Sequence, residues 1–135
     1  MNAREQRRAP LDIEACRRNL AARQSVRRRE NRKLWNRARA DASAIVACIV
    51  RRYRPERVWQ WGSVLRPAMF GPFSDIDIAV EGEYDAETWF QLLGEVWAMT
   101  EFSLDCVDLR RIEPEFADLI RLKGKVVYER NASAS

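Results

Sequence analysis

The spacing of hydrophobic and polar residues changes along the chain at Pro55. Upstream of it, residues 11–53 contain neither proline nor glycine and are rich in alanine, arginine, leucine and glutamate, which favours helix. Near the end of this segment apolar residues recur every four positions, as Ile45 and Ile49 do. This spacing predicts a well-buried amphipathic helix that Pro55 ends.

The first part of the same segment is much more polar. Its large apolar residues are too few for a continuous stripe among the arginines: Leu20, Val26, Leu34 and Trp35. We therefore predict an arginine-rich helical arm, partly exposed unless a partner covers it, and leave open whether it is one helix or two helices with a break.

Downstream of Pro55 strands and helices alternate. We predict strands at residues 57–61, 75–81, 102–109 and 125–129, and helices at residues 84–99 and 114–124. Asp85 is the expected N-cap of the first of these helices, Pro114 begins the second and Gly124 ends it. The first helix has one apolar stripe, made of Trp89, Leu92, Leu93, Val96 and Trp97. This order predicts an α+β fold, with α/β-like alternation, in which a small mixed sheet is packed with helices.

A length of 135 residues suits a single domain with an appendage. We divide the chain into a basic helical arm at residues 1–43, a folded domain at 44–130 and a disordered tail at 131–135. No apolar run approaches the roughly 18 residues needed to cross a bilayer, and no apolar segment follows the basic N-terminus as in a secretory signal. We therefore expect a cytoplasmic protein without membrane contact.

Charge is divided unevenly along the chain. Residues 1–54 hold 16 basic and 5 acidic side chains, a net charge of +11, whereas residues 55–135 hold 8 and 15, a net charge of −7. Three interpretations fit: an arm for nucleic acid, a helix folded back on an acidic body, or a docking surface for an acidic partner. Direct nucleic-acid binding is the least favoured, because Trp35 is the only aromatic residue in the arm before Tyr53.

The cysteines do not indicate a metal site. The chain has three of them and no histidine, and no two form a C-x-x-C pair, so a zinc site is not expected. We interpret Cys16, Cys48 and Cys106 as small buried hydrophobic residues in a reducing compartment.

Two carboxylates lie one residue apart in the predicted strand at 75–81. Successive side chains of a strand alternate between its faces, so Asp75 and Asp77 share a face with Cα atoms about 6.5–7 Å apart, while Ile76 and Ile78 are buried on the other. Unpaired, these carboxylates repel and raise each other's pKa, and the run contains no lysine or arginine. Binding of Mg²⁺ or Mn²⁺ would relieve the repulsion, which makes this a candidate metal site.

A simpler interpretation is that Ser74 and Asp75 cap a turn and Asp77 lies at a solvent-facing strand edge. Gly62 and Ser63 favour the metal site, because they follow the strand at 57–61 directly. There a glycine allows close approach of a phosphate, and free N–H groups and a hydroxyl can bind its oxygens.

A third carboxylate lies in the predicted strand at 102–109. Alternation places Asp105 on the face opposite to Cys106 and Asp108. If this strand neighbours the strand at 75–81, Asp105 joins the other two carboxylates beside the metal.

The sequence letters GS at 62–63, SDIDIAV at 74–80 and LDCVDL at 104–109 occur in this order, separated by a short loop and a helix. Over residues 57–128 this pattern resembles the nucleotidyltransferase superfamily of polymerase-β type, and the short chain resembles its minimal nucleotidyltransferases. The resemblance implies a nucleotidyltransferase fold, and a reaction in which an acceptor hydroxyl attacks the α-phosphorus of a nucleoside triphosphate and releases pyrophosphate.

The resemblance also implies roles for individual residues. Mg²⁺ and the triphosphate would be held by the catalytic carboxylates, of which the third could also take the proton of the incoming hydroxyl: Asp75, Asp77 and Asp105. Contacts to the nucleotide would come from Gly62, Ser63, Arg66 and Ser74.

The chain departs from the family pattern at three points. Eleven residues separate Ser63 from Asp75 where ten are usual, and Pro67 replaces a common glycine, so the helix after the Gly-Ser pair must be short or distorted. Arg66 is then either a phosphate contact or a surface charge. Asp108 is a rival third carboxylate, although alternation places it on the other face.

Minimal members of this superfamily are frequently antitoxins that add AMP to a tyrosine of a HEPN ribonuclease toxin. The resemblance therefore implies an adenylyltransferase antitoxin that uses ATP and Mg²⁺ and has a HEPN toxin as partner. The alternatives are a binding module that neutralises its partner without catalysis, an enzyme that adenylylates a small molecule such as an aminoglycoside, and an arm that binds RNA.

Overall fold

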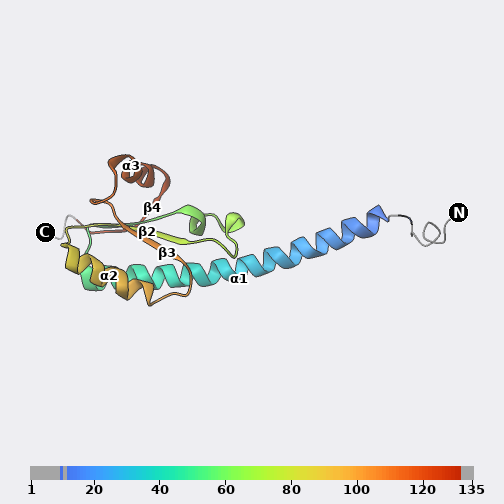
Figure 1. The fold of residues 1–135 in the computed structure, drawn as a ribbon, viewed down its shortest axis with the longest axis horizontal. Helices are drawn as coiled ribbons and strands as arrows, with labels where there is room; N and C mark the ends of the chain where they lie inside the picture. The colour runs from blue at the N-terminus through green and yellow to red at the C-terminus, as the bar shows by residue number, and fades with distance from the viewer. Residues whose placement is uncertain (1–9, 11, 132–135) are drawn as a thin grey trace, which may run out of the picture. The chain divides into compact units, whose positions relative to one another are not determined.

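The computed structural model describes Pro10 and residues 12–131, so the predicted tail lies almost wholly outside the described residues (Figure 1). It comprises two compact units, one ending at Glu30 and the other formed by Asn31–Ser135. Helix α1 is continuous over Ile13–Tyr53, so the option of two helices is wrong. The sequence contains no glycine or proline there that could interrupt the hydrogen bonds of the helix.

In the first unit the described side chains are almost all exposed. The apolar residues Leu20 and Val26 are 58% and 50% exposed, as expected for an uncovered arm. Cys16 is also exposed, whereas Cys48 and Cys106 are buried. Our prediction of three buried cysteines is thus wrong for Cys16, because the described side chains around it in this unit are almost all exposed and form no core of their own.

The second unit is built on a four-stranded sheet with the order β3-β2-β1-β4. Its strands are β1 Arg57–Trp61, β2 Ile76–Glu81, β3 Leu104–Asp108 and β4 Lys125–Glu129. Strand β1 is antiparallel to both β2 and β4, and β2 is parallel to β3. The predicted mixed sheet is confirmed.

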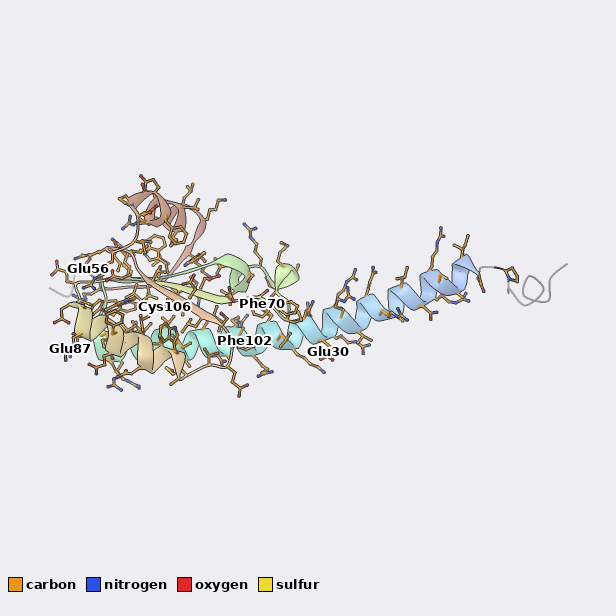
Figure 2. All side chains as sticks on the ribbon, in the orientation of Figure 1. Glu30, Glu56, Phe70, Glu87, Phe102 and Cys106 are labelled. Atoms are coloured by element: carbon orange, nitrogen blue, oxygen red, sulfur yellow. The ribbon has the colours of Figure 1, made fainter. Side chains whose placement is uncertain are left out.

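One face of the sheet packs against helix α2 (Ala86–Trp97) and the part of α1 after Asn31 (Figure 1). Phe70, Phe102 and Cys106 also contribute to this main core, and the two phenylalanine rings lie 6.1 Å apart (Figure 2). The fully buried residues of this core come from α1, the strands and α2, and include Ile45, Ile49, Val58, Ile76, Ile78, Val80, Leu92 and Val96.

The other face of the sheet is covered in part by helix α3 (Pro114–Lys123). Trp59 and Trp61 pack there, and the Trp61 ring meets that of Phe116 edge-on at 5.5 Å. Val58 directly precedes Trp59 in sequence but points to the opposite face, where it belongs to the main core. A second, smaller hydrophobic core therefore lies between α3 and the sheet.

The ends of the predicted helices follow local sequence signals. Asp85 caps α2 by accepting a hydrogen bond from the Thr88 N–H at 2.8 Å, and Pro114 and Gly124 bound α3 as predicted. The apolar stripe predicted for α2 is not buried along its whole length, because Trp97 at the end of the helix is 53% exposed.

Within the described range no helix is long and apolar enough to cross a membrane.

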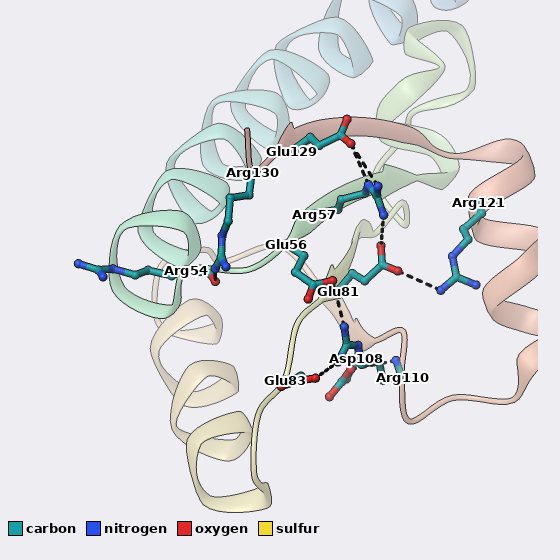
Figure 3. Close-up of polar contacts among 10 residues, drawn as sticks. All are labelled: Arg54, Glu56, Arg57, Glu81, Glu83, Asp108, Arg110, Arg121, Glu129 and Arg130. Atoms are coloured by element: carbon teal, nitrogen blue, oxygen red, sulfur yellow. Dashed lines mark hydrogen bonds and ion pairs between the residues drawn. The ribbon is translucent and has the colours of Figure 1, made fainter. Parts of the chain in front are cut away.

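An ion-pair network occupies the end of the sheet where β2 finishes (Figure 3). Glu81 pairs with Arg57 at 3.5 Å and with Arg121 of α3 at 3.2 Å, and Arg57 also pairs with Glu129. The Glu81 side chain is mostly buried, but its arginine partners and Glu129 reach solvent, so each pair adds little to stability. They nevertheless match Arg57 and Arg121 with carboxylates.

Candidate active site

Two of the three predicted carboxylates are neighbours in the sheet. The parallel pairing of β2 and β3 sets Asp77 directly opposite Asp105, and Asp75 lies one residue before β2. Ile76 and Ile78 are fully buried on the other face, so the predicted alternation is confirmed. Asp77 is only 8% exposed, whereas Asp75 and Asp105 are exposed.

The environment of Asp77 disfavours its charged form. Burial raises the pKa of this carboxyl to about 6, and the nearby charges of Asp105 and then Asp75 add to the effect. No hydrogen bond or ion pair to its side chain is present among the described residues. The repulsion predicted from the sequence is therefore present and is not relieved by a basic side chain.

Gly62 lies against Asp77 because β1 ends beside the start of β2. Trp61 pairs with Asp77 across the two strands, and the chain then turns with a φ of +77° at Gly62. A Cβ atom at Gly62 would overlap Oδ2 of Asp77, so only glycine fits. The indole N–H of Trp35 in α1 donates to the carbonyl oxygen of Val64 at 2.9 Å and anchors the turn.

The segment after Gly62 forms two short 3₁₀ turns, at Gly62–Leu65 and Pro67–Met69. The Arg66 N–H donates to the Ser63 carbonyl oxygen at 2.9 Å, and Pro67 begins the second turn. The predicted short helix after the Gly-Ser pair is confirmed, and it leaves Arg66 exposed between the turns.

A cleft of about 390 Å³ opens beside this segment. The Gly-Ser turn and Arg66 form one side and α3 forms the other, with Lys123 at its end. From the sequence, the position of Lys123 at a helix end is explained by the helix dipole, and a role in nucleotide binding is the less favoured interpretation. The residues that line the cleft include Trp61, Gly62, Ser63, Arg66, Phe116 and Lys123.

Two further candidates, the predicted nucleotide contact Ser74 and the rival third carboxylate Asp108, interact with groups outside the carboxylate cluster. The Ser74 hydroxyl oxygen accepts a hydrogen bond from the Gly71 N–H at 2.9 Å, which closes the turn before β2. Asp108 accepts from the Arg110 N–H at 3.0 Å and pairs with Arg111 at 3.3 Å. The structure does not bring Asp108 to the other carboxylates, whereas the role of Ser74 in nucleotide binding stays a prediction.

The donor set fits a hard divalent cation once phosphate oxygens are counted. Over residues 12–131 no three His, Cys, Asp or Glu side chains form a preformed metal site. Asp77 and Asp105, however, offer adjacent carboxylates on one face, and Asp77 has no basic partner in the described chain. Mg²⁺ keeps several ligands from water or substrate phosphates, so a site completed by a nucleotide matches its chemistry.

The model of the family described as "Polymerase beta, Nucleotidyltransferase" matches residues 44–133, which is more than half of the chain. The chain belongs to this nucleotidyltransferase family. The match begins after the arginine-rich arm, and the division between arm and domain at residues 43 and 44 stays a prediction.

Solved structures of similar fold include three toxin–antitoxin complexes. A chain of the toxin–antitoxin MntA–HepT is 19% identical over 67% of this chain and 72% of its own, with a TM-score of 0.52. A chain of a toxin–antitoxin with AMP-PNP is 21% identical over 67% and 75%, with a TM-score of 0.53. A chain of the tri-AMPylated Shewanella oneidensis HEPN toxin in complex with its MNT antitoxin is 20% identical over 72% and 76%, with a TM-score of 0.51. No curated protein matches the sequence.

Proposed function

We propose that this chain is a cytoplasmic, Mg²⁺-dependent adenylyltransferase that moves AMP from ATP to a tyrosine hydroxyl of a HEPN-type toxin and so acts as its antitoxin. The pairing of Asp77 with Asp105 beside the Gly62 turn carries the proposal, because two adjacent carboxylates next to a glycine turn suit the binding of a cation and a triphosphate in a nucleotidyltransferase. The printed descriptions of similar structures, which name an AMPylated HEPN toxin and AMP-PNP, support the choice of acceptor and nucleotide.

In this proposal each residue has a defined task. Asp75, Asp77 and Asp105 would hold the cation, which when bound neutralises the triphosphate and polarises the α-phosphate. Asp105 is exposed and would accept the proton of the attacking hydroxyl. The N–H groups and hydroxyl at Gly62 and Ser63 would bind phosphate oxygens. A new bond forms between the acceptor oxygen and the α-phosphorus, and the bond to pyrophosphate breaks.

The test is co-expression with a HEPN protein encoded beside this chain, followed by intact-mass measurement of that protein. We expect additions of one or more AMP units, which disappear when a tyrosine of the acceptor is replaced by phenylalanine. The control is the double variant Asp75→Asn/Asp77→Asn, which removes two carboxylates without adding bulk. An unmodified partner in a pair that still neutralises toxicity would contradict the proposal and support neutralisation by binding alone.

We further propose that the arm at residues 1–43 docks on an acidic surface of the same partner. Its described part carries many exposed arginines, and the family match begins only at residue 44. Oppositely charged surfaces accelerate association and give it a strong salt dependence.

Replacing Arg27, Arg28 and Arg29 together by glutamine is expected to weaken the complex with the partner about tenfold or more at low salt. The matched control replaces the same three residues by lysine, which keeps the charge and should keep most of the affinity. Binding measured at two salt concentrations checks this, because the difference between the variants should shrink as salt rises. Equal affinities for all three proteins would contradict the docking role.

A further inference from the structure

Charge changes sign along the end of the sheet that carries the Gly-Ser turn. In the strand order β3-β2-β1-β4, Asp105 and Asp77 lie at this end on the first two strands. Trp61 and the Gly62 turn follow on β1, and Lys123 ends α3, with Gly124 between it and β4. A ligand that runs across this end from β3 towards β4 would pass from carboxylates to cations.

Two cations meet at the cleft beside the turn. Arg66 lines it from the segment after the Gly-Ser pair and Lys123 lines it from α3. Neither forms an ion pair within the described part of the chain. Arg121 on the same helix, by contrast, pairs with Glu81 at 3.2 Å and with Asp118 at 3.6 Å. Arg66 and Lys123 thus lack a carboxylate partner among the described residues, whereas Arg57 and Arg121 have one at the opposite end of the sheet (Figure 3).

The rest of the cleft is mainly apolar. Trp61, Phe116 and Leu119 line it, and the first two rings pack edge to face. Apolar walls lower the local dielectric constant, so a charge in the cleft interacts more strongly with Arg66 and Lys123 than it would in water. The repulsion between two unpaired cations beside such walls is relieved best by an anion that carries more than one charge.

We propose that Lys123 joins Arg66 in binding the β- and γ-phosphates of the nucleoside triphosphate, an inference that rests on the proposed transferase function. The α-phosphate then lies at Asp77 and Asp105, and the polyphosphate crosses Gly62 and Ser63 towards the cations. When the acceptor oxygen bonds to the α-phosphorus, the bond to the β-phosphate oxygen breaks and its electron pair stays with pyrophosphate. Lys123 stabilises this developing charge, while the acceptor proton passes to Asp105.

The test measures binding of AMP, ADP and a non-hydrolysable ATP analogue with Mg²⁺ to the full chain and to its Lys123→Met variant. The affinity of the wild-type protein is expected to rise with each added phosphate. The variant should bind the ATP analogue about ten- to a hundredfold more weakly, the effect of one charge-assisted hydrogen bond, and AMP with unchanged affinity. Because Lys123 is exposed, its thermal unfolding midpoint should stay the same.

The matched control is Lys125→Met, two residues away on β4 and outside the cleft lining, which should bind all three nucleotides like the wild-type protein. If Lys123→Met binds the ATP analogue as tightly as the wild-type protein does, the phosphate role of Lys123 is overturned while the transferase proposal stands. If the wild-type protein binds none of the nucleotides in the presence of Mg²⁺, both proposals are overturned.

Discussion

Replacing Asp77 by asparagine is expected to reduce AMP transfer by roughly a thousandfold or more, because a neutral amide would hold a divalent cation, and with it the triphosphate, far less tightly than a carboxylate does. Release of pyrophosphate in the presence of the acceptor protein measures this loss. An asparagine side chain has almost the same volume as an aspartate side chain, so the fold should persist. Transfer at a wild-type rate in this variant would contradict the assignment of the site.

The same substitution is expected to stabilise the metal-free protein. The pKa of Asp77 is raised to about 6 in the folded chain, so the folded state favours the protonated carboxyl. Wild-type stability should therefore fall as pH rises from about 4 to about 6 and stay reduced above that. Asparagine carries no charge, so the variant should gain on the order of 1–2 kcal/mol at pH 7 and nothing below pH 4. Urea unfolding in EDTA at several pH values measures the difference.

A control variant separates the site from burial of charge in general. Asp108 is also buried, but it lies on the other face of β3 and has Arg111 and the Arg110 N–H as partners. Asp108→Asn is expected to destabilise the protein and to keep its thermal stabilisation by Mg²⁺ with nucleotide, whereas Asp77→Asn should lose that stabilisation. An equal Mg²⁺ response in both variants would count against a site at Asp77.

Much of this site could be predicted from the sequence, because strand alternation is a local property. The spacing of Asp75, Ile76 and Asp77 fixes which side chains share a face, and the strands at residues 57–61 and 125–129 begin and end where predicted. The neighbour of Asp77 is different, since it depends on how strands far apart in sequence pair. From the sequence, Asp105 joins the other carboxylates only if its strand neighbours β2. The parallel pairing of β2 and β3 shows that it does.

Other features depend on tertiary packing and have no local signal. Lys123 reaches the cleft only because α3 ends beside β1, where a Cβ atom at Gly124 would crowd the Gln60 carbonyl oxygen. Trp97 lies on the predicted stripe of α2 yet stays half-exposed, because the helix ends there and no other described element covers it. The polarity of the arm left open whether α1 is one helix or two, and the helix is continuous because polarity alone does not end a helix without glycine or proline.

Replacing Gly62 by alanine is expected to destabilise the protein by about 2–4 kcal/mol and to abolish nucleotide binding. Its positive φ of +77° costs a residue with a Cβ atom about 1–2 kcal/mol, and overlap of that atom with Oδ2 of Asp77 adds to the cost. Urea unfolding measures the first effect, and titration with an ATP analogue and Mg²⁺ measures the second. Nucleotide binding should be lost because the Gly62 turn, which we propose binds phosphate, lies directly against Asp77, which we propose holds the cation.

The control is Gly94→Ala in the middle of α2, where a Cβ atom would meet no atom within 4 Å. That variant should gain about 0.5–1 kcal/mol, because alanine favours helix over glycine. A double-mutant cycle then isolates the contact: in an Asp77→Ala background, Gly62→Ala should cost only the backbone part, so the two substitutions are less than additive. Strict additivity would mean that Gly62 and Asp77 are not in contact. That result would contradict the position of the Gly62 turn beside the carboxylates.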